Sequence, residues 1–152
     1  MKNVPLVNSG IYAVVDDSDF DVCKVRRWRL TNDGYVRTTD SSRTFMHVLI
    51  MGYAPSDGWD HKNGHKWDCQ RDNLRPATVS QNGANRKRSK NNSSGYKGVD
   101  WQGGLWRVRL AVEKKRLYLG HFKDLIEAAR SYDKAAKQHF GEYARLNFPE
   151  TT

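Results

Sequence analysis

Residues 105–112 read Leu105-Trp106-Arg107-Val108-Arg109-Leu110-Ala111-Val112, and this stretch decides the fold of the carboxy-terminal part of the chain. Apolar and basic side chains alternate in it, and successive side chains of a β-strand point to opposite faces of a sheet. One face carries Trp106, Val108 and Leu110, while the other carries Arg107 and Arg109. The stretch therefore predicts a strand with one face on a core and a cationic opposite face.

Similar segments flank this strand and predict an antiparallel sheet of three strands. Residues 96–101 and 115–121 are the other two strands, separated from the first by tight turns. In the third strand, Leu117 and Leu119 oppose Arg116 and Tyr118. A helix follows, which begins at an Asp124 and Glu127 capping box, ends at Gly141 and packs on the sheet. Its apolar and small residues share one face: Leu125, Ala128, Ala129, Tyr132, Ala135, Ala136 and Phe140.

Residues 83–94 precede this sheet and contain no large apolar side chain. Such a segment cannot bury a core, so we expect a linker. It has four basic and no acidic residues. Basic side chains of a linker contact DNA phosphates and add affinity rather than sequence choice. The expected phosphate contacts are Arg86, Lys87, Arg88 and Lys90.

The segment from Trp59 to Arg75 loses apolar periodicity and fills with Asp, His, Asn and Lys. Cleavage of a phosphodiester needs an activated water and stabilisation of the developing charge. His61 can take a proton from water near neutral pH. Asp60 and the side-chain oxygen of Asn82 are hard ligands suited to one Mg²⁺ or Mn²⁺. Asn73 is expected to hold the His61 ring in the tautomer that leaves a bare nitrogen facing the water.

Asp60 and His61 are adjacent, and neighbours in a regular strand point to opposite faces. They can share a site only where the strand ends or bulges, which Gly58 and Gly64 allow. Thr78 and Gln81 form a further capping-box pattern, so a short helix starting at Val79 is expected to carry Asn82.

The amino-terminal part predicts a β-rich start. Residues 11–15 form a strand, and residues 25–38 form a hairpin that turns at Asn32-Asp33-Gly34. Residues 45–51 predict one or two helical turns. The role of His47 within them stays open between facing a phosphate and packing the helix.

Composition favours a polyanionic partner. The chain has 26 Lys and Arg against 17 Asp and Glu, and its pI is near 9.7. Residues 1–60 carry 7 basic and 8 acidic side chains, so the excess lies after residue 60. Cys23 and Cys69 have no zinc or disulfide spacing and are expected to be buried small hydrophobes. No apolar run suits a membrane span, so we expect a cytoplasmic protein, in the host cell if phage-encoded, with no membrane partner and no small-molecule substrate.

The segment around His61 resembles the H-N-H endonuclease family, in the phage and intron branch whose last position is Asn. The motif runs through Trp59-Asp60-His61, Asn63-Gly64, Asp72-Asn73-Leu74-Arg75 and Gln81-Asn82 to Asn85. The resemblance implies a ββα-metal (His-Me finger) nuclease with catalytic His61 and Asn73 and with Asp60 and Asn82 at a divalent metal. Asp68-Cys69-Gln70 departs from the common Asp-Asn-Arg of the family.

The carboxy-terminal segment resembles the plant ethylene-response-factor (APETALA-type) DNA-binding domain. The resemblance rests on Ser94-Gly95-Tyr96-Lys97-Gly98-Val99, residues 105–109, residues 116–120, residues 127–136 and Ala144-Arg145-Leu146-Asn147-Phe148-Pro149. It implies a sheet that enters the major groove of double-stranded DNA. The resemblance implies a contact by Lys97, and strand alternation adds the expected contacts Arg107, Arg109, Arg116 and Tyr118. Asp100 replaces an arginine of the plant family, so the plant target sequence is not carried over. We expect Trp101 and Trp106 in the core rather than on bases.

These expectations combine into an α+β protein with an HNH nuclease module at 1–82, a basic linker at 83–94 and an APETALA-type domain at 95–150. The expected function is a site-targeted DNA endonuclease of the homing or mobile type, typical of bacteriophages, acting as a monomer or as a dimer assembled on DNA. Two alternatives stay open: a non-catalytic DNA-binding regulator on an HNH scaffold, and a binder of structured RNA.

Overall fold

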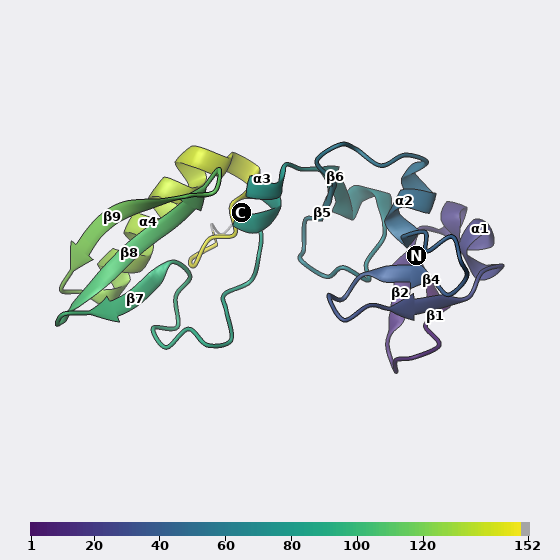
Figure 1. Cartoon of the computed structure of the whole chain (residues 1–152), viewed down its shortest axis with the longest axis horizontal. Coiled ribbons are helices and arrows are strands. Elements are labelled where there is room, and N and C mark those ends of the chain that lie inside the picture. Colours follow the sequence, from purple (N-terminus) through teal and green to yellow (C-terminus); the bar gives the residue numbers. More distant parts are fainter. Residues whose placement is uncertain (150–152) are drawn as a thin grey trace. The chain divides into compact units, whose positions relative to one another are not determined.

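The computed structural model describes residues 1–149, and the chain is a mixed α and β protein with small antiparallel sheets. It divides into two compact units, Met1–Ala77 and the part from Thr78 onward, which are described separately (Figure 1). The expected division at residues 82 and 94 stays a prediction, and its end at residue 150 lies outside the described residues. No helix within residues 1–149 has the length and apolar character to cross a membrane.

The first unit contains three two-stranded antiparallel sheets and short helices. Its strands are β1 (Lys2–Pro5) with β2 (Tyr12–Val15), β3 (Trp28–Leu30) with β4 (Val36–Thr38), and β5 (Trp59–His61) with β6 (Leu74–Pro76). Its helices are α1 (Phe20–Lys24) and α2 (Met46–Met51), with 3-10 turns η1 (Asp17–Asp19) and η2 (Arg71–Asn73). The expected strand at 11–15, the 25–38 hairpin and the 45–51 helix are confirmed, whereas β1 and α1 were not predicted.

The core of the first unit forms where its small sheets turn their apolar faces inward. Trp28 is fully buried, and its indole Nε1 donates to the carbonyl of Cys23 at 2.8 Å. Cys23 and Cys69 are both buried free thiols in this core, as expected. Burial raises the pKa of Cys23 to about 11 and also raises the pKa of Cys69. Both thiols are therefore protonated, and they pack as small apolar groups.

The second unit contains the predicted three-stranded antiparallel sheet in the order β7 (Val99–Gln102), β8 (Leu105–Val112) and β9 (Lys115–Phe122). Helix α4 (Leu125–Phe140) lies along one face of it (Figure 1). The side chain of Asp124 accepts from the Glu127 amide at the start of α4, and Gly141 ends the helix, as expected. Helix α3 (Val79–Ala84) and the turn η3 (Gly141–Tyr143) also pack in this unit.

Alternation along β8 sorts its side chains as the sequence predicts. Val108 and Leu110 are buried in the core with the alanines of α4, and Trp106 packs beside them. The expectation that Trp101 lies in the core is wrong, because 54% of its surface is exposed. Trp101 lies opposite Trp106 in the β7–β8 ladder, with ring centroids 4.6 Å apart. It covers Trp106 at the edge of the sheet instead of filling the interior.

Candidate functional site

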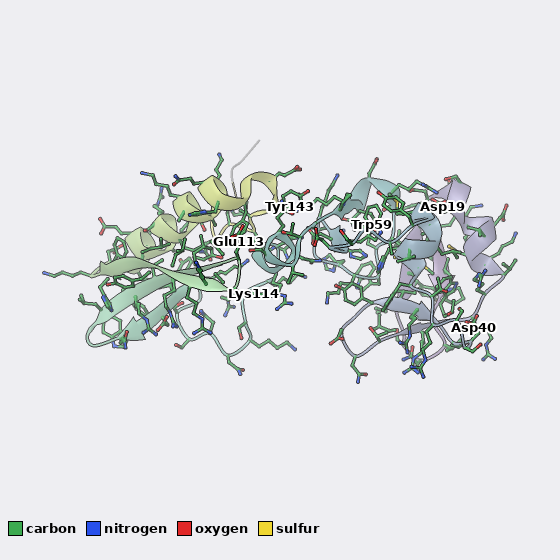
Figure 2. The ribbon with its side chains drawn as sticks, turned by 45° about the horizontal axis from the view of Figure 1, so that its top comes forward. Asp19, Asp40, Trp59, Glu113, Lys114 and Tyr143 are labelled. Carbon is green, nitrogen blue, oxygen red and sulfur yellow. The ribbon has the colours of Figure 1, made fainter. Side chains whose placement is uncertain are left out.

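The β5–β6 hairpin positions two of the residues expected to act in cleavage. Asp60 lies opposite Arg75 and His61 opposite Leu74 in the antiparallel register. Strand β5, which begins at Trp59 (labelled in Figure 2), ends at His61. A turn follows in which the Gly64 amide donates to the His61 carbonyl at 2.7 Å. The strand ends at His61, and a shared site for Asp60 and His61 stays a prediction.

Asp60 is ion-paired with Arg75 inside this hairpin. Arg75 Nε donates to Asp60 Oδ2 at 3.0 Å, and Arg75 Nη2 lies 2.9 Å from the same oxygen. Asp60 is 3% exposed and Arg75 is 8% exposed. A buried carboxylate needs a counter-charge because desolvation of an isolated charge is costly. Arg75 supplies that charge, a role that the sequence analysis did not assign.

His61 is held in an aromatic environment and is 3% exposed. The centroid of its ring lies 5.3 Å from that of His47 and 5.9 Å from that of Tyr35. Burial lowers the pKa of His61 to about 3, and Coulombic interactions with His47 and Lys66 act in the same direction. The imidazole is therefore neutral at physiological pH, which is the form that a general base requires.

Asn73 closes the loop between the two strands. Its Oδ1 accepts from the Asn63 amide at 3.0 Å, and its Nδ2 donates to the Asp68 carbonyl at 2.7 Å. We expected this amide to orient the His61 ring directly, but neither hydrogen bond goes to His61. The physical reason is that the loop backbone presents unpaired polar groups that an amide can satisfy. Asn73 can act on His61 only by fixing the loop that follows it.

Asn82 lies on α3 in the second unit, where Thr78 and Gln81 form the predicted capping box. Within residues 1–149, no three or more His, Cys, Asp or Glu side chains gather as a metal-binding group. The donors expected for a metal are one carboxylate, Asp60, and one amide oxygen, Asn82. Both are oxygen donors, which suit Mg²⁺ or Mn²⁺, although Asp60 Oδ2 already accepts from Arg75.

His47 joins the neighbourhood of His61 from α2. It is 7% exposed, and its ring stacks on Phe45 with centroids 5.4 Å apart. Its Nδ1 is buried and has no hydrogen-bond partner within the described part of the chain. Burial lowers the pKa of His47 to about 4. Local sequence patterns could not predict that Tyr35 and His47 contact His61, because the three residues lie far apart in the chain.

The polar face of the second unit's sheet carries the expected DNA contacts. Arg107 Nη2 lies 2.5 Å from Asp100 Oδ2, and Arg109 Nη2 lies 3.0 Å from Asp100 Oδ1. Burial opposes ionisation of Asp100, but the hydrogen bonds from both arginines outweigh it and lower its pKa. Arg116 and Tyr118 are exposed on β9. An open cavity of about 260 Å³ has Asn92, Asp100, Arg109 and Arg116 among its lining residues.

Lys97 makes a contact within the second unit, and its expected contact with DNA stays a prediction. Its ammonium donates to the carbonyl of Ala84 inside the second unit. Burial lowers the pKa of Lys97 to about 8, and the charge of Arg145 acts in the same direction. The local reason is that Lys97 is half-buried against α3, whose last carbonyls need donors.

The expected linker contacts lie on the surface: Arg86, Lys87, Arg88 and Lys90 are exposed. Arg88 Nη1 donates to the Asn92 carbonyl at 3.2 Å. The guanidinium of Arg88 thus also holds the turn that leads into β7.

Comparison with known proteins relates the chain to nucleases and to DNA-binding proteins, although no protein-family model matches it. It is 28% identical over 150 residues to an uncharacterized HNH endonuclease of Acanthamoeba polyphaga mimivirus, covering 91% of this chain and 75% of that protein. It is 61% identical over 36 residues to dehydration-responsive element-binding protein 2E of Arabidopsis thaliana, covering 24% of this chain.

The chain spans only 15% of that plant protein's length and 36% of the length of dehydration-responsive element-binding protein 2A of Oryza sativa. The match to Protein 3.8 of Escherichia phage T7 is 32% identical over 89 residues. It covers 57% of this chain and 73% of the phage protein. The chain therefore belongs to the same family as Protein 3.8 of Escherichia phage T7.

Proposed function

We propose that the chain is a site-targeted, metal-dependent DNA endonuclease of the homing or mobile type. The observation that carries the proposal is the neutral, buried His61 at the end of β5, next to Asp60 and opposite β6. The likeness to a mimivirus protein named an HNH endonuclease supports it. In this proposal β5 and β6 are the two strands of a ββα-metal module.

His61 takes the proton of the attacking water. The neutral form of the imidazole is the one that can accept a proton, and Tyr35 and His47 pack against its ring. Asn73 has a positioning role, because its two hydrogen bonds hold the loop that leaves β5 immediately after His61. Asp60 and His61 are both almost fully buried. The scissile phosphate can therefore reach them only if the side chains that cover them move.

Asp60 and Asn82 would hold the divalent cation, Mg²⁺ or Mn²⁺, which would supply Lewis-acid stabilisation of the charge on the phosphate. Arg75 orients the Asp60 carboxylate within the hairpin. The second unit would bring the nuclease to its site by placing the polar face of the sheet in the major groove. The arginines and lysines of the linker would contact DNA phosphates.

A cleavage assay on supercoiled plasmid carrying random inserts tests the proposal. The native protein should nick or linearise the plasmid in Mg²⁺ or Mn²⁺ and not in EDTA. His61→Ala should abolish cutting, while His139→Ala on the exposed surface of α4 should retain it as a matched control. DNA retention without any cutting in either metal would refute the nuclease.

The second candidate is a DNA-binding regulator that does not cut. Its support is the likeness to plant proteins named dehydration-responsive element-binding proteins. The same assay separates the two candidates, because a regulator would shift plasmid mobility without breaking strands. Binding of structured RNA in place of duplex DNA at fixed salt would exclude both.

A further inference from the structure

The hairpin of β3 and β4 places two arginines directly opposite each other. Arg29 pairs with Arg37 in the antiparallel register. The neighbouring residues Trp28, Val36 and Thr38 are buried in the core of the first unit, so alternation places both arginines on the outer face. We call this outer face, defined by Arg29 and Arg37, the arginine face.

Among the described residues, no ion pair compensates the positive charges of the arginine face. Like charges directly opposite in a sheet destabilise it. Within residues 1–149, no carboxylate forms an ion pair with Arg29 or Arg37. Moreover, Arg37 Nε is buried and has no hydrogen-bond partner among the described residues. A donor in that state carries a desolvation cost that an added anion would relieve.

The nearest acids in sequence do not supply that anion. Asp40, labelled in Figure 2, accepts from the hydroxyl groups of Thr38 and Ser42 in the turn after β4. Asp33 lies at the hairpin turn, where its backbone carbonyl accepts from Lys66 Nζ at 2.9 Å. Neither carboxylate forms a salt bridge with the arginine face.

Charge within the first unit is segregated. Residues 1–21 contain one basic residue, Lys2, against four acids. Residues 22–43 contain six basic residues against Asp33 and Asp40. Basic residues are therefore concentrated in the segment that contains the β3–β4 hairpin, whereas acidic residues predominate in the segment before it. Such local concentration attracts polyanions even when the net charge is small.

The arginine face is linked to the proposed catalytic residue through intermediate residues of the first unit. The backbone of Arg37 pairs with that of Phe45 in an isolated antiparallel β-bridge, and the Phe45 ring stacks on the His47 ring. Tyr35 precedes β4 by one residue, and its ring lies 5.9 Å from that of His61. Two short routes therefore link the arginines to His61 within the first unit. A polyanion held at Arg29 and Arg37 would lie along the same hairpin that packs on His61.

We infer that the arginine face binds backbone phosphates of the DNA that the nuclease unit cuts. The inference rests on the proposed function, because it takes duplex DNA as the partner. Guanidinium groups suit the task, since each can donate two parallel hydrogen bonds to phosphate oxygens. The nuclease unit thus has its own hold on the DNA, in addition to the basic linker and the sheet of the second unit.

The test is a salt titration of binding by the full chain to a random-sequence duplex in EDTA, where no cutting interferes. Arg29→Gln and Arg37→Gln are compared with Lys24→Gln, which removes one charge from α1 where Lys24 pairs with Asp21. Each lost phosphate contact lowers the slope of log affinity against log salt by about 0.9. Both arginine variants should lose about that much, and Lys24→Gln should keep the native slope.

The thermal midpoint in the absence of DNA provides an independent readout. Removing one of two opposed like charges should leave the midpoint of Arg29→Gln unchanged or raise it. An arginine with a purely structural role would instead lower it. If Arg37→Gln unfolds, the exposed Arg29 carries the test alone.

Unchanged salt slopes in both variants would overturn the inference and leave the nuclease proposal standing. Slopes that fall on structured RNA but not on duplex DNA would overturn the assignment of DNA as the ligand. Conversely, a native protein that never cuts in Mg²⁺ or Mn²⁺ but shows the slope losses on DNA would retain the arginine face and lose the nuclease.

Discussion

Asp60 and Arg75 face each other across the β5–β6 hairpin, with Arg75 Nε donating to Asp60 Oδ2 at 3.0 Å in a buried environment. The pair joins the two strands at the position immediately before His61. It therefore links the stability of the hairpin to the geometry of the proposed active site. Loss of either partner should therefore change both the stability of the hairpin and the geometry of the proposed active site.

Arg75→Met should destabilise the first unit by about 3 kcal/mol, because the Asp60 carboxylate would lose its buried counter-cation. Urea unfolding followed by tryptophan fluorescence measures the loss. Asp60→Asn with Arg75→Met should recover part of it, since no charge is then left uncompensated. Losses that simply add in the double variant would show that the two side chains do not stabilise each other.

Stability should fall as the solution is acidified, because His47 and His61 are buried as neutral rings. Burial lowers the pKa of His47 from 6.5 to about 4, so the unfolded chain binds its proton first as the pH falls. The contribution is complete above the unfolded pKa and is lost as the pH falls toward the folded value. Between about pH 7.5 and about pH 5, His47 alone should cost about 2 kcal/mol.

His47→Phe keeps an aromatic ring against Phe45 and removes the titrating group. Its unfolding free energy should depend less on pH than that of the native protein by about 2 kcal/mol over the same interval. Denaturant unfolding at both pH values measures the difference. An identical pH dependence in the two proteins would mean that His47 is not neutral and buried in solution.

The second unit could be predicted in detail from local patterns. Residues 105–112 alternate strictly, and strand alternation fixes which side chains face the helix. Trp101 shows the limit of that reasoning, because alternation assigns a face but does not show where the covering helix stops. Trp101 belongs to the edge of the sheet, where its ring stays 54% exposed.

The candidate site could be predicted only as a set of residue types. The motif identified Asp60 and His61, and the glycines beside them indicated a strand end. It could not identify Arg75 as the partner of Asp60, because the register of β5 and β6 depends on the length and closure of the loop between them. The hydrogen bond from Lys97 to the carbonyl of Ala84 on α3 could not be predicted for a similar reason.

Gly98→Ala should destabilise the second unit by at least about 2 kcal/mol. Gly98 has a φ of +77°, and an added Cβ would lie 2.0 Å from Tyr132 Cδ2. Gly104→Ala is the matched control: its φ is +81°, but no atom lies within 4 Å of the added Cβ. The control should lose only about 1 kcal/mol from backbone strain. Equal thermal shifts in the two variants would contradict the close packing of β7 on α4.

Asp100→Asn should make DNA binding tighter and less selective. Asp100 accepts from both Arg107 and Arg109, so it neutralises part of the cationic sheet face and restricts both guanidinium groups. Restrained arginines lose less freedom on binding and can reach bases only from fixed positions. Releasing them should favour phosphate contacts, which are independent of sequence.

The measurement is affinity for a selected site and for random duplex over a range of salt. Asp100→Asn should raise affinity for random duplex, steepen the salt slope by about 0.9 for each arginine that gains a phosphate, and lower the ratio of specific to random binding. Glu113→Gln, in the β8–β9 turn labelled in Figure 2, removes the same charge from an exposed position away from these arginines. Because any neutralised acid increases long-range attraction, only a change in selectivity beyond that of Glu113→Gln can be assigned to the arginines. Equal selectivity in the two variants would mean that Asp100 acts through net charge alone.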